Sequence, residues 1–272
     1  MMYDVSKVRY VSLIRLEGGE SILSIPYAEM SVDPDLIAGF VTAVIIFAKA
    51  PIRTISKAAY DILIEVGETV LVLLVVDPVP DETPYREKLK RILSQVETEH
   101  GEKLKNFEGD IRRFREFALN VIVEFPYGNI QPNLIPVRKA GKPIPFRVGE
   151  IDRKLEKLEA FINGKRSVAE ILDLIELRDE EVKALLSLMK HYGAVDFRKR
   201  LDEKDVLVTD DTSSSSVARL RDQYGRPVDD LIKFFDGSRN VKEVVHSLPY
   251  DHDALLFLIN KLVECGGLRV VF

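Results

Sequence analysis

The feature that most constrains the fold is an internal duplication in the second half of the chain. Residues 158–171 (LEAFINGKRSVAEI) align without a gap with residues 231–244 (LIKFFDGSRNVKEV), at an offset of 73 residues. The same offset pairs Gly193 with Gly266. Shared apolar spacing alone would be weak support, but Phe, Gly, Val and Glu all hold one register. The second half is therefore predicted to contain two copies of one small module.

The residue pattern of each copy predicts three helices followed by a strand. An Asn-Gly or Asp-Gly pair (residues 163–164 and 236–237) ends the first helix, since glycine readily takes the left-handed conformation that follows a helix. Ser167 or Asn240 then caps a second helix, with a Glu three residues later that completes a capping box. The third helices are expected over 179–192 and 251–264, and the strands over 194–197 and 268–271.

This order of elements resembles a winged helix. In the first copy, residues 197–201 and 206–208 are expected to pair as the wing hairpin, whereas the second copy has only one strand after its third helix. Asp210–Ser216 contains four consecutive serines and is expected to be a flexible separator, followed by a short connecting helix over 217–224.

The first part of the chain predicts a sheet with helices. Strands are expected over 9–16, 21–26, 52–56, 59–66 and 70–76, with a hairpin turn at Gly18-Gly19. Asp33-Pro34 is a helix-start signal, and the helix that it opens runs to about Ala50. Two further helices are expected over 84–99, ended by Gly101, and over 109–125.

The element order, the Gly-Gly hairpin, the Asp33-Pro34-Asp35 helix start and the final helical pair resemble the longin family over roughly residues 5–127. Glu99–Phe117 resembles the region between the last two longin helices through Gly101, Leu104, Phe107, Gly109-Asp110 and Phe114. Roadblock domains are close relatives with a permuted order and remain an alternative. The resemblance implies a platform for small GTPases and for trafficking or signalling complexes. A longin domain followed by winged helices is also the layout of nitrogen permease regulator-like proteins, which act on GTPases within a larger complex.

The expected fold class is α+β: a longin-like five-stranded antiparallel sheet with helices, plus two mostly α winged-helix-like modules. The expected divisions are a longin-like domain (1–127), a Pro/Gly-rich linker (128–149), the first repeat (150–209), a Ser-rich linker (210–224) and the second repeat (225–272). The Pro/Gly-rich segment could instead be an arm that wraps a partner.

The helix that begins at Asp33-Pro34 lacks the polar outer face expected of a helix packed on one side of a sheet. Such a helix is either buried on both sides within one chain or pairs with a partner. We favour an interface for homo- or hetero-oligomerisation, with Phe40, Val44 and Phe47 as its residues.

Nucleic-acid binding is disfavoured by a net charge of −5 and by third helices that offer acidic or apolar residues where base-reading donors would stand. The contrary feature is a basic stretch, Arg198, Lys199 and Arg200, a candidate contact for nucleic acid or an acidic partner. A solvated turn is the favoured interpretation. The alternative function is a DNA-associated transcriptional regulator that uses the winged-helix-like modules.

Catalysis has little support. The four histidines lack zinc-ligand spacing, there is one cysteine, and no phosphate-binding loop follows Gly18-Gly19. We therefore expect no enzyme activity, cofactor or metal. The apolar runs are too short for a transmembrane segment, and neither a signal peptide nor a disulfide is expected, so a cytoplasmic location is predicted. The charge-rich composition favours a thermophilic, archaeal-like protein.

Overall fold

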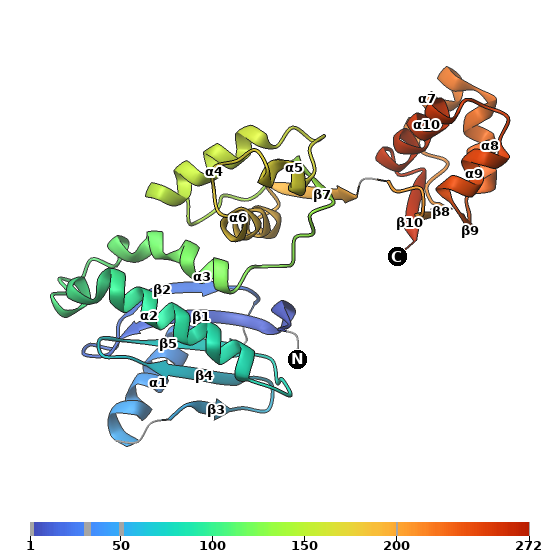
Figure 1. The fold of residues 1–272 in the computed structure, drawn as a ribbon. Helices are drawn as coiled ribbons and strands as arrows, with labels where there is room; N and C mark the ends of the chain where they lie inside the picture. The colour runs from blue at the N-terminus through green and yellow to red at the C-terminus, as the bar shows by residue number, and fades with distance from the viewer. Residues whose placement is uncertain (1–2, 30–33, 49–51, 200, 272) are drawn as a thin grey trace. The chain divides into compact units, whose positions relative to one another are not determined.

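The computed structural model describes residues 3–29, 34–48, 52–199 and 201–271 of the chain (Figure 1). The chain forms two compact units, Met1–Arg198 and Lys199–Phe272. Within the described residues, no helix combines the length and the apolar character needed to cross a membrane.

The first unit contains a five-stranded antiparallel sheet, as expected. Its order is β2 (Ser21–Pro26), β1 (Val8–Arg15), β5 (Val70–Val76), β4 (Asp61–Val66) and β3 (Thr54–Ser56). Every residue of the central strand β5 is buried. Because side chains alternate across a strand, Val70, Val72, Leu74 and Val76 enter one core while Leu71, Leu73 and Val75 enter another. The continuous apolar run in β5 thus follows from cover on both faces of the sheet.

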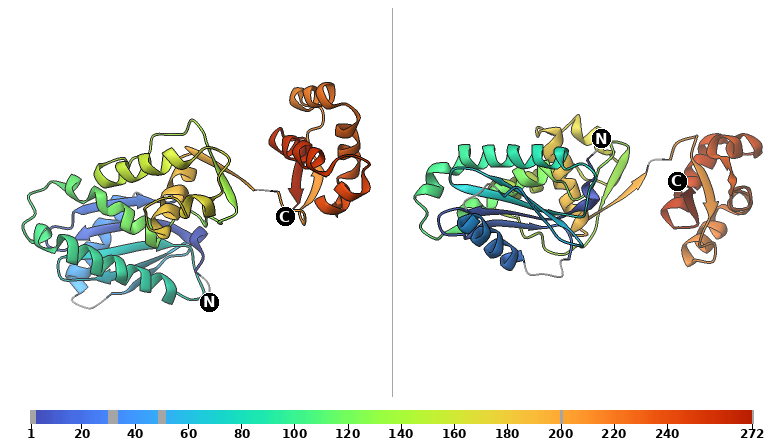
Figure 2. Two further views of the ribbon diagram at one scale, coloured as in Figure 1. Left: turned by 45° about the horizontal axis from the view of Figure 1, so that its top comes forward. Right: turned by 90° about the horizontal axis from the view of Figure 1, so that it is seen from below.

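Helices cover these two faces (Figure 2). Helix α1 (Pro34–Ala48) lies on one face, and α2 (Thr83–Lys105) lies on the other together with the 3₁₀ segment η2 (Ile111–Phe117) and α3 (Ala118–Glu124).

Two helix predictions were wrong in detail. Helix α2 continues past Gly101 to Lys105, because one more turn buries Leu104 in the core. That burial offsets the cost of about 1 kcal/mol of a glycine inside a helix. The expected helix over 109–125 divides into η2 and α3. Residues three apart eclipse in a 3₁₀ helix, which places Phe114 and Phe117 together in the core.

The first repeat also belongs to the first unit. Its elements are β6 (Leu134–Arg138), α4 (Gly149–Phe161), α5 (Val168–Leu172), α6 (Asp179–His191) and β7 (Val195–Lys199). The expected capping box of Ser167 and Glu170 is present. Strand β6 lies inside the predicted linker 128–149 and pairs with β7. The segment also buries Ile130, Ile135, Ile144 and Phe146, so it is a packed part of the unit.

The second unit has its own core. Its elements are β8 (Val206–Thr209), α7 (Ser215–Tyr224), α8 (Arg226–Phe234), β9 (Asp236–Asn240), α9 (Val241–Ser247), α10 (His252–Glu264) and β10 (Leu268–Val271). The expected capping box of Asn240 and Glu243 is present. The short helix expected after the serines is α7: Ser214 caps it and Val217 is fully buried, so the serines form the helix start and not a bare separator.

The predicted wing hairpin is wrong. Strand β8 pairs with β10 and β9, in the order β10-β8-β9, and β7 pairs with β6. Each repeat therefore has paired strands before and after its helices. Matching hydrogen bonds support this equivalence: Lys139 N donates to Ala194 O (2.9 Å), and Asp210 N donates to Gly267 O (3.1 Å). Residues 206–209 thus belong with the second repeat, not with the first.

Candidate protein-interaction surface

Helix α1 presents apolar side chains in two directions. Ile37 and Val41 are buried against the sheet, in a core with residues of β1, β4 and β5. Leu36 and Phe40 point away from that core and are 67% and 48% exposed. The two outward residues are four apart and so lie on the same side of the helix.

The three residues predicted for an interface differ in how far their side chains are exposed. Phe40 lies on the outward face, Val44 is half-buried, and the side chain of Phe47 lies outside the described residues. Leu36 was missed, although its spacing from Phe40 is the signal that identifies it. The exposed apolar surface of α1 is centred on Leu36 and Phe40.

Small residues adjoin these two side chains. Gly39 and Ala43 are exposed. Among the described residues, and leaving aside its chain neighbours and the backbone of α1, no atom lies within 4 Å of where a Cβ of residue 39 would stand. A glycine on an exposed helix face lets another backbone approach closely. The Nζ atom of Lys57 lies 5.5 Å from the centroid of the Phe40 ring, a cation–π contact at the edge of the surface. We call Leu36, Gly39, Phe40 and Ala43 the α1 face; all four residues are exposed.

The basic stretch makes contacts within the protein. A guanidinium nitrogen of Arg198 donates to the carbonyl oxygen of Gly164. The ammonium group of Lys199 pairs with Asp205. Arg200 lies outside the described residues. Both of the described basic side chains therefore have roles in local structure.

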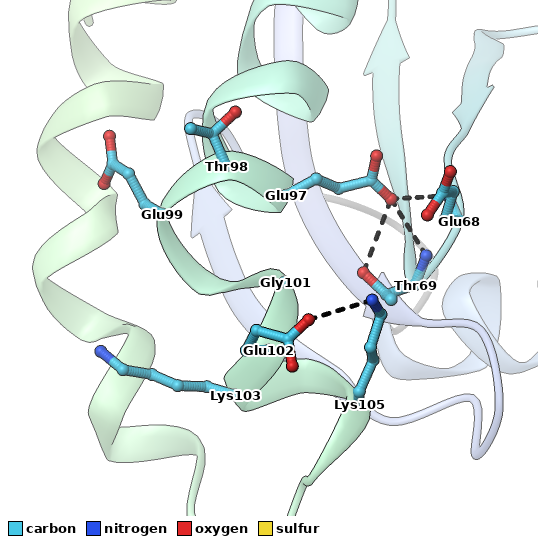
Figure 3. A pocket seen from close by; sticks show the side chains of 9 residues that line it. All are labelled: Glu68, Thr69, Glu97, Thr98, Glu99, Gly101, Glu102, Lys103 and Lys105. Carbon is cyan, nitrogen blue, oxygen red and sulfur yellow. Dashed lines mark hydrogen bonds and ion pairs between the residues drawn. The ribbon is translucent and has the colours of Figure 1, made fainter.

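A polar hollow of about 400 Å³ lies beside the end of α2 (Figure 3). The carboxylate of Glu97 accepts the backbone N–H groups of Glu68 (2.6 Å) and Thr69 (3.0 Å). These bonds attach the turn between β4 and β5 to the helix. Lys105 pairs with Glu102 at 3.1 Å in the same wall. We interpret the hollow as a structural junction, since Glu97 bonds to the turn between β4 and β5 and Lys105 pairs with Glu102.

The four histidines occupy three separate places in the structure. His100 packs edge-on against Phe114 and Phe117, and burial lowers its pKa. The ring of His191 stacks on Tyr127. His246 and His252 lie near the ends of α9 and α10, with their ring centroids 4.8 Å apart. In the part of the chain that the structure describes, no group of three or more His, Cys, Asp or Glu side chains is placed to hold a metal ion.

The chain was compared with protein-family models and with curated proteins, and neither comparison suggests a role for the α1 face. No protein-family model matches the chain, and no curated protein is significantly similar to it.

Proposed function

We propose that the chain is a non-enzymatic protein-interaction platform, an adaptor or regulatory subunit for a small GTPase or for a trafficking or signalling complex. The observation that carries the proposal is the α1 face, where Leu36 and Phe40 are exposed while the opposite side of the helix is already buried in the core. Exposed apolar surface rimmed by polar groups is typical of protein interfaces. The partner is a protein that covers this face.

The small-GTPase part of the proposal rests on the resemblance of residues 5–127 to longin domains. That resemblance predicts a five-stranded antiparallel sheet with one helix between its second and third strands and a final helical pair. The element order from β1 to α3 in the first unit agrees with it. The second part of that layout is supported by two repeats that each contain helices with a capping box and paired strands.

The alternative, a DNA-associated regulator, has less support. The basic stretch would have to release two of its internal contacts, those of Arg198 with Gly164 and of Lys199 with Asp205, to reach a phosphate backbone. The net charge of −5 also disfavours approach to DNA.

The test is affinity capture of the tagged full chain from its native cell extract with GTP or GDP added, read by mass spectrometry. The platform proposal predicts recovery of a small GTPase whose amount depends on the nucleotide. Phe40→Glu should abolish the recovery, because it places a charge in the centre of the α1 face. Leu174→Glu is the matched control, since Leu174 is a 54% exposed apolar residue outside α1.

Recovery of DNA or of transcription machinery without a GTPase would favour the alternative. If Phe40→Glu recovers the GTPase in the same amount as the parent chain, the α1 face is not the binding surface. Circular dichroism of both variants checks that each retains the fold of the parent chain.

A further inference from the structure

The third helices of the two repeats have different environments. In the first repeat, one side of α6 packs against the sheet part of the unit, next to α3. Ala184, Ser187 and Leu188 are buried there, and the N–H of Tyr127 donates to the Ser187 hydroxyl at 3.1 Å. The Tyr127 ring stacks on His191 with centroids 4.2 Å apart. This side of α6 is thus a surface on which the first repeat packs against the rest of its unit.

In the second repeat, the equivalent side of α10 is exposed. The offset of 73 places Phe257, Asn260, Lys261 and Glu264 where the first repeat has Ala184, Ser187, Leu188 and His191. Phe257 is 47% exposed, although the first repeat buries the equivalent residue. Tyr224 packs edge-on against its ring at 6.0 Å, which holds the ring in place. An exposed aromatic residue on a surface that the sister repeat uses for packing marks an interface.

The charges on this side of α10 are self-complementary. Asp253 lies four residues before Phe257 and Lys261 lies four residues after it, so one turn separates each charge from the ring. When two copies of α10 run antiparallel with Phe257 opposite Phe257, each Asp253 lies opposite the Lys261 of the other copy. The arrangement forms two ion pairs around one aromatic contact.

We propose that a second copy of this chain docks on this side of α10, with the two helices antiparallel about a twofold axis at Phe257. Such an interface is isologous, since the same patch serves both chains. The helix macrodipoles are then opposed, and Asp253 in the first turn of each helix meets Lys261 in the last turn of the other. The existing pair of Lys261 with Glu264 at 3.0 Å is half-exposed, so exchanging it for Asp253 of the other copy costs little.

This interface is separate from the α1 face and does not depend on the proposed function. The second unit has its own hydrophobic core, so its helices are held in place without a contribution from α1.

The test is the mass of the full chain in solution, measured by analytical ultracentrifugation over a range of concentrations in a Phe40→Glu background. That background removes any association through the α1 face. We expect a mass that rises with concentration to twice the 30.9 kDa of one chain. Phe257→Glu should weaken association about thirtyfold or more, which is the usual effect of losing a central aromatic residue. Leu174→Glu is the control and should leave the association unchanged.

Charge reversal supplies the decisive variants. D253K alone sets two lysines opposite each other and should weaken the dimer, and K261D alone should do the same with two aspartates. The double variant D253K/K261D restores opposite charges only when residues 253 and 261 of different copies face each other, so it should recover the dimer. Because these residues are on the surface, the variants are expected to fold, and circular dichroism verifies it.

A chain that stays at 30.9 kDa at every concentration in the Phe40→Glu background overturns the proposal. A dimer that is unchanged by Phe257→Glu, or a double charge variant as weak as the single ones, also overturns it. If the parent chain dimerises and Phe40→Glu alone abolishes the dimer, self-association occurs through the α1 face. That result rules out the α10 interface and does not affect the proposed function.

Discussion

The first repeat shares one continuous hydrophobic core with the five-stranded sheet, whereas the second repeat has a core of its own. Their internal architecture is similar, since each has a capping box, glycines with positive φ after its helices and paired strands at its two ends. The second repeat also has the helix α7 and a third strand, β9. They differ on the outer side of the third helix. There α6 carries Leu188, which is buried, and α10 carries Lys261, which is half-exposed. A duplicated module thus keeps its inner packing and adapts its outer side to its neighbours.

The strongest test exchanges that outer residue between the repeats. Leu188→Lys places an ammonium group in a fully buried position and should destabilise the first unit by about 3 kcal/mol. The matched change, Lys261→Leu, is at the surface and should alter the stability of the second unit by less than about 0.5 kcal/mol. Hydrogen exchange read by mass spectrometry reports each unit separately, because peptides from β5 and from α9 belong to different units.

Equal effects of the two changes would contradict the comparison, since they would mean that both positions have the same environment. Loss of protection in the second unit on Leu188→Lys would show that the two units do not unfold independently.

A second test concerns a close approach that is found in the first repeat. A Cβ at Gly141 would stand 2.3 Å from the backbone nitrogen of Ala194, beside the pairing of β6 with β7. Backbone cannot yield as a flexible side chain can, so Gly141→Ala should cost about 1–3 kcal/mol. Gly164→Ala is a useful contrast, since it adds no clash but strains a backbone with φ +71°. Chemical denaturation measures both, and a neutral Gly141→Ala would show that the two strands can separate at no cost.

Local patterns in the sequence predicted local structure well. The strands β2 and β5 have the expected bounds, and both capping boxes are present. The partner of β8 could not be found in this way, because strand pairing joins distant segments and a short apolar strand fits several partners. Extending the repeat backwards would have helped, since β8 lies 71 residues after the last four residues of β6.

The candidate surface was predicted only in part for a related reason. An apolar helix signals that both sides are covered or paired, but the side that meets the sheet depends on how the helix is rotated. Phe40 was correctly placed on the outer side, Leu36 was missed, and Val44 turned out to be half-buried. The sequence indicates an apolar third helix in the second repeat but does not separate its open side from its core side, because Phe257 fits the same apolar pattern as the core residues Leu255 and Leu258.

The capping boxes offer a test in which the repeats should behave alike. Glu170 N donates to the Ser167 hydroxyl at 3.2 Å, and Glu243 N donates to Asn240 Oδ1 at 2.9 Å. Replacing either cap with alanine should therefore destabilise its own unit by about 1 kcal/mol. Hydrogen exchange of α5 and α9 gives the two values. A cost confined to one repeat would show that only one of the two caps contributes to stability.

The smallest expected effect is a pH dependence that belongs to the first repeat. Burial against Tyr127 lowers the pKa of His191, and the nearby charge of Lys142 lowers it further. The unfolded state then binds a proton more readily than the folded state, so the stabilisation is complete above the ordinary histidine pKa of about 6.5 and is lost as pH falls below it. His191→Gln should flatten this dependence in the first unit. The second repeat has Glu264 at the equivalent position, so its unit should not show this contribution.

His100 also lies in the first unit, and burial lowers its pKa as well. His100→Gln is therefore the control that separates the contributions of the two histidines. An unchanged pH profile in His191→Gln would mean that the stacked ring is as easily protonated in the folded chain as in the unfolded one.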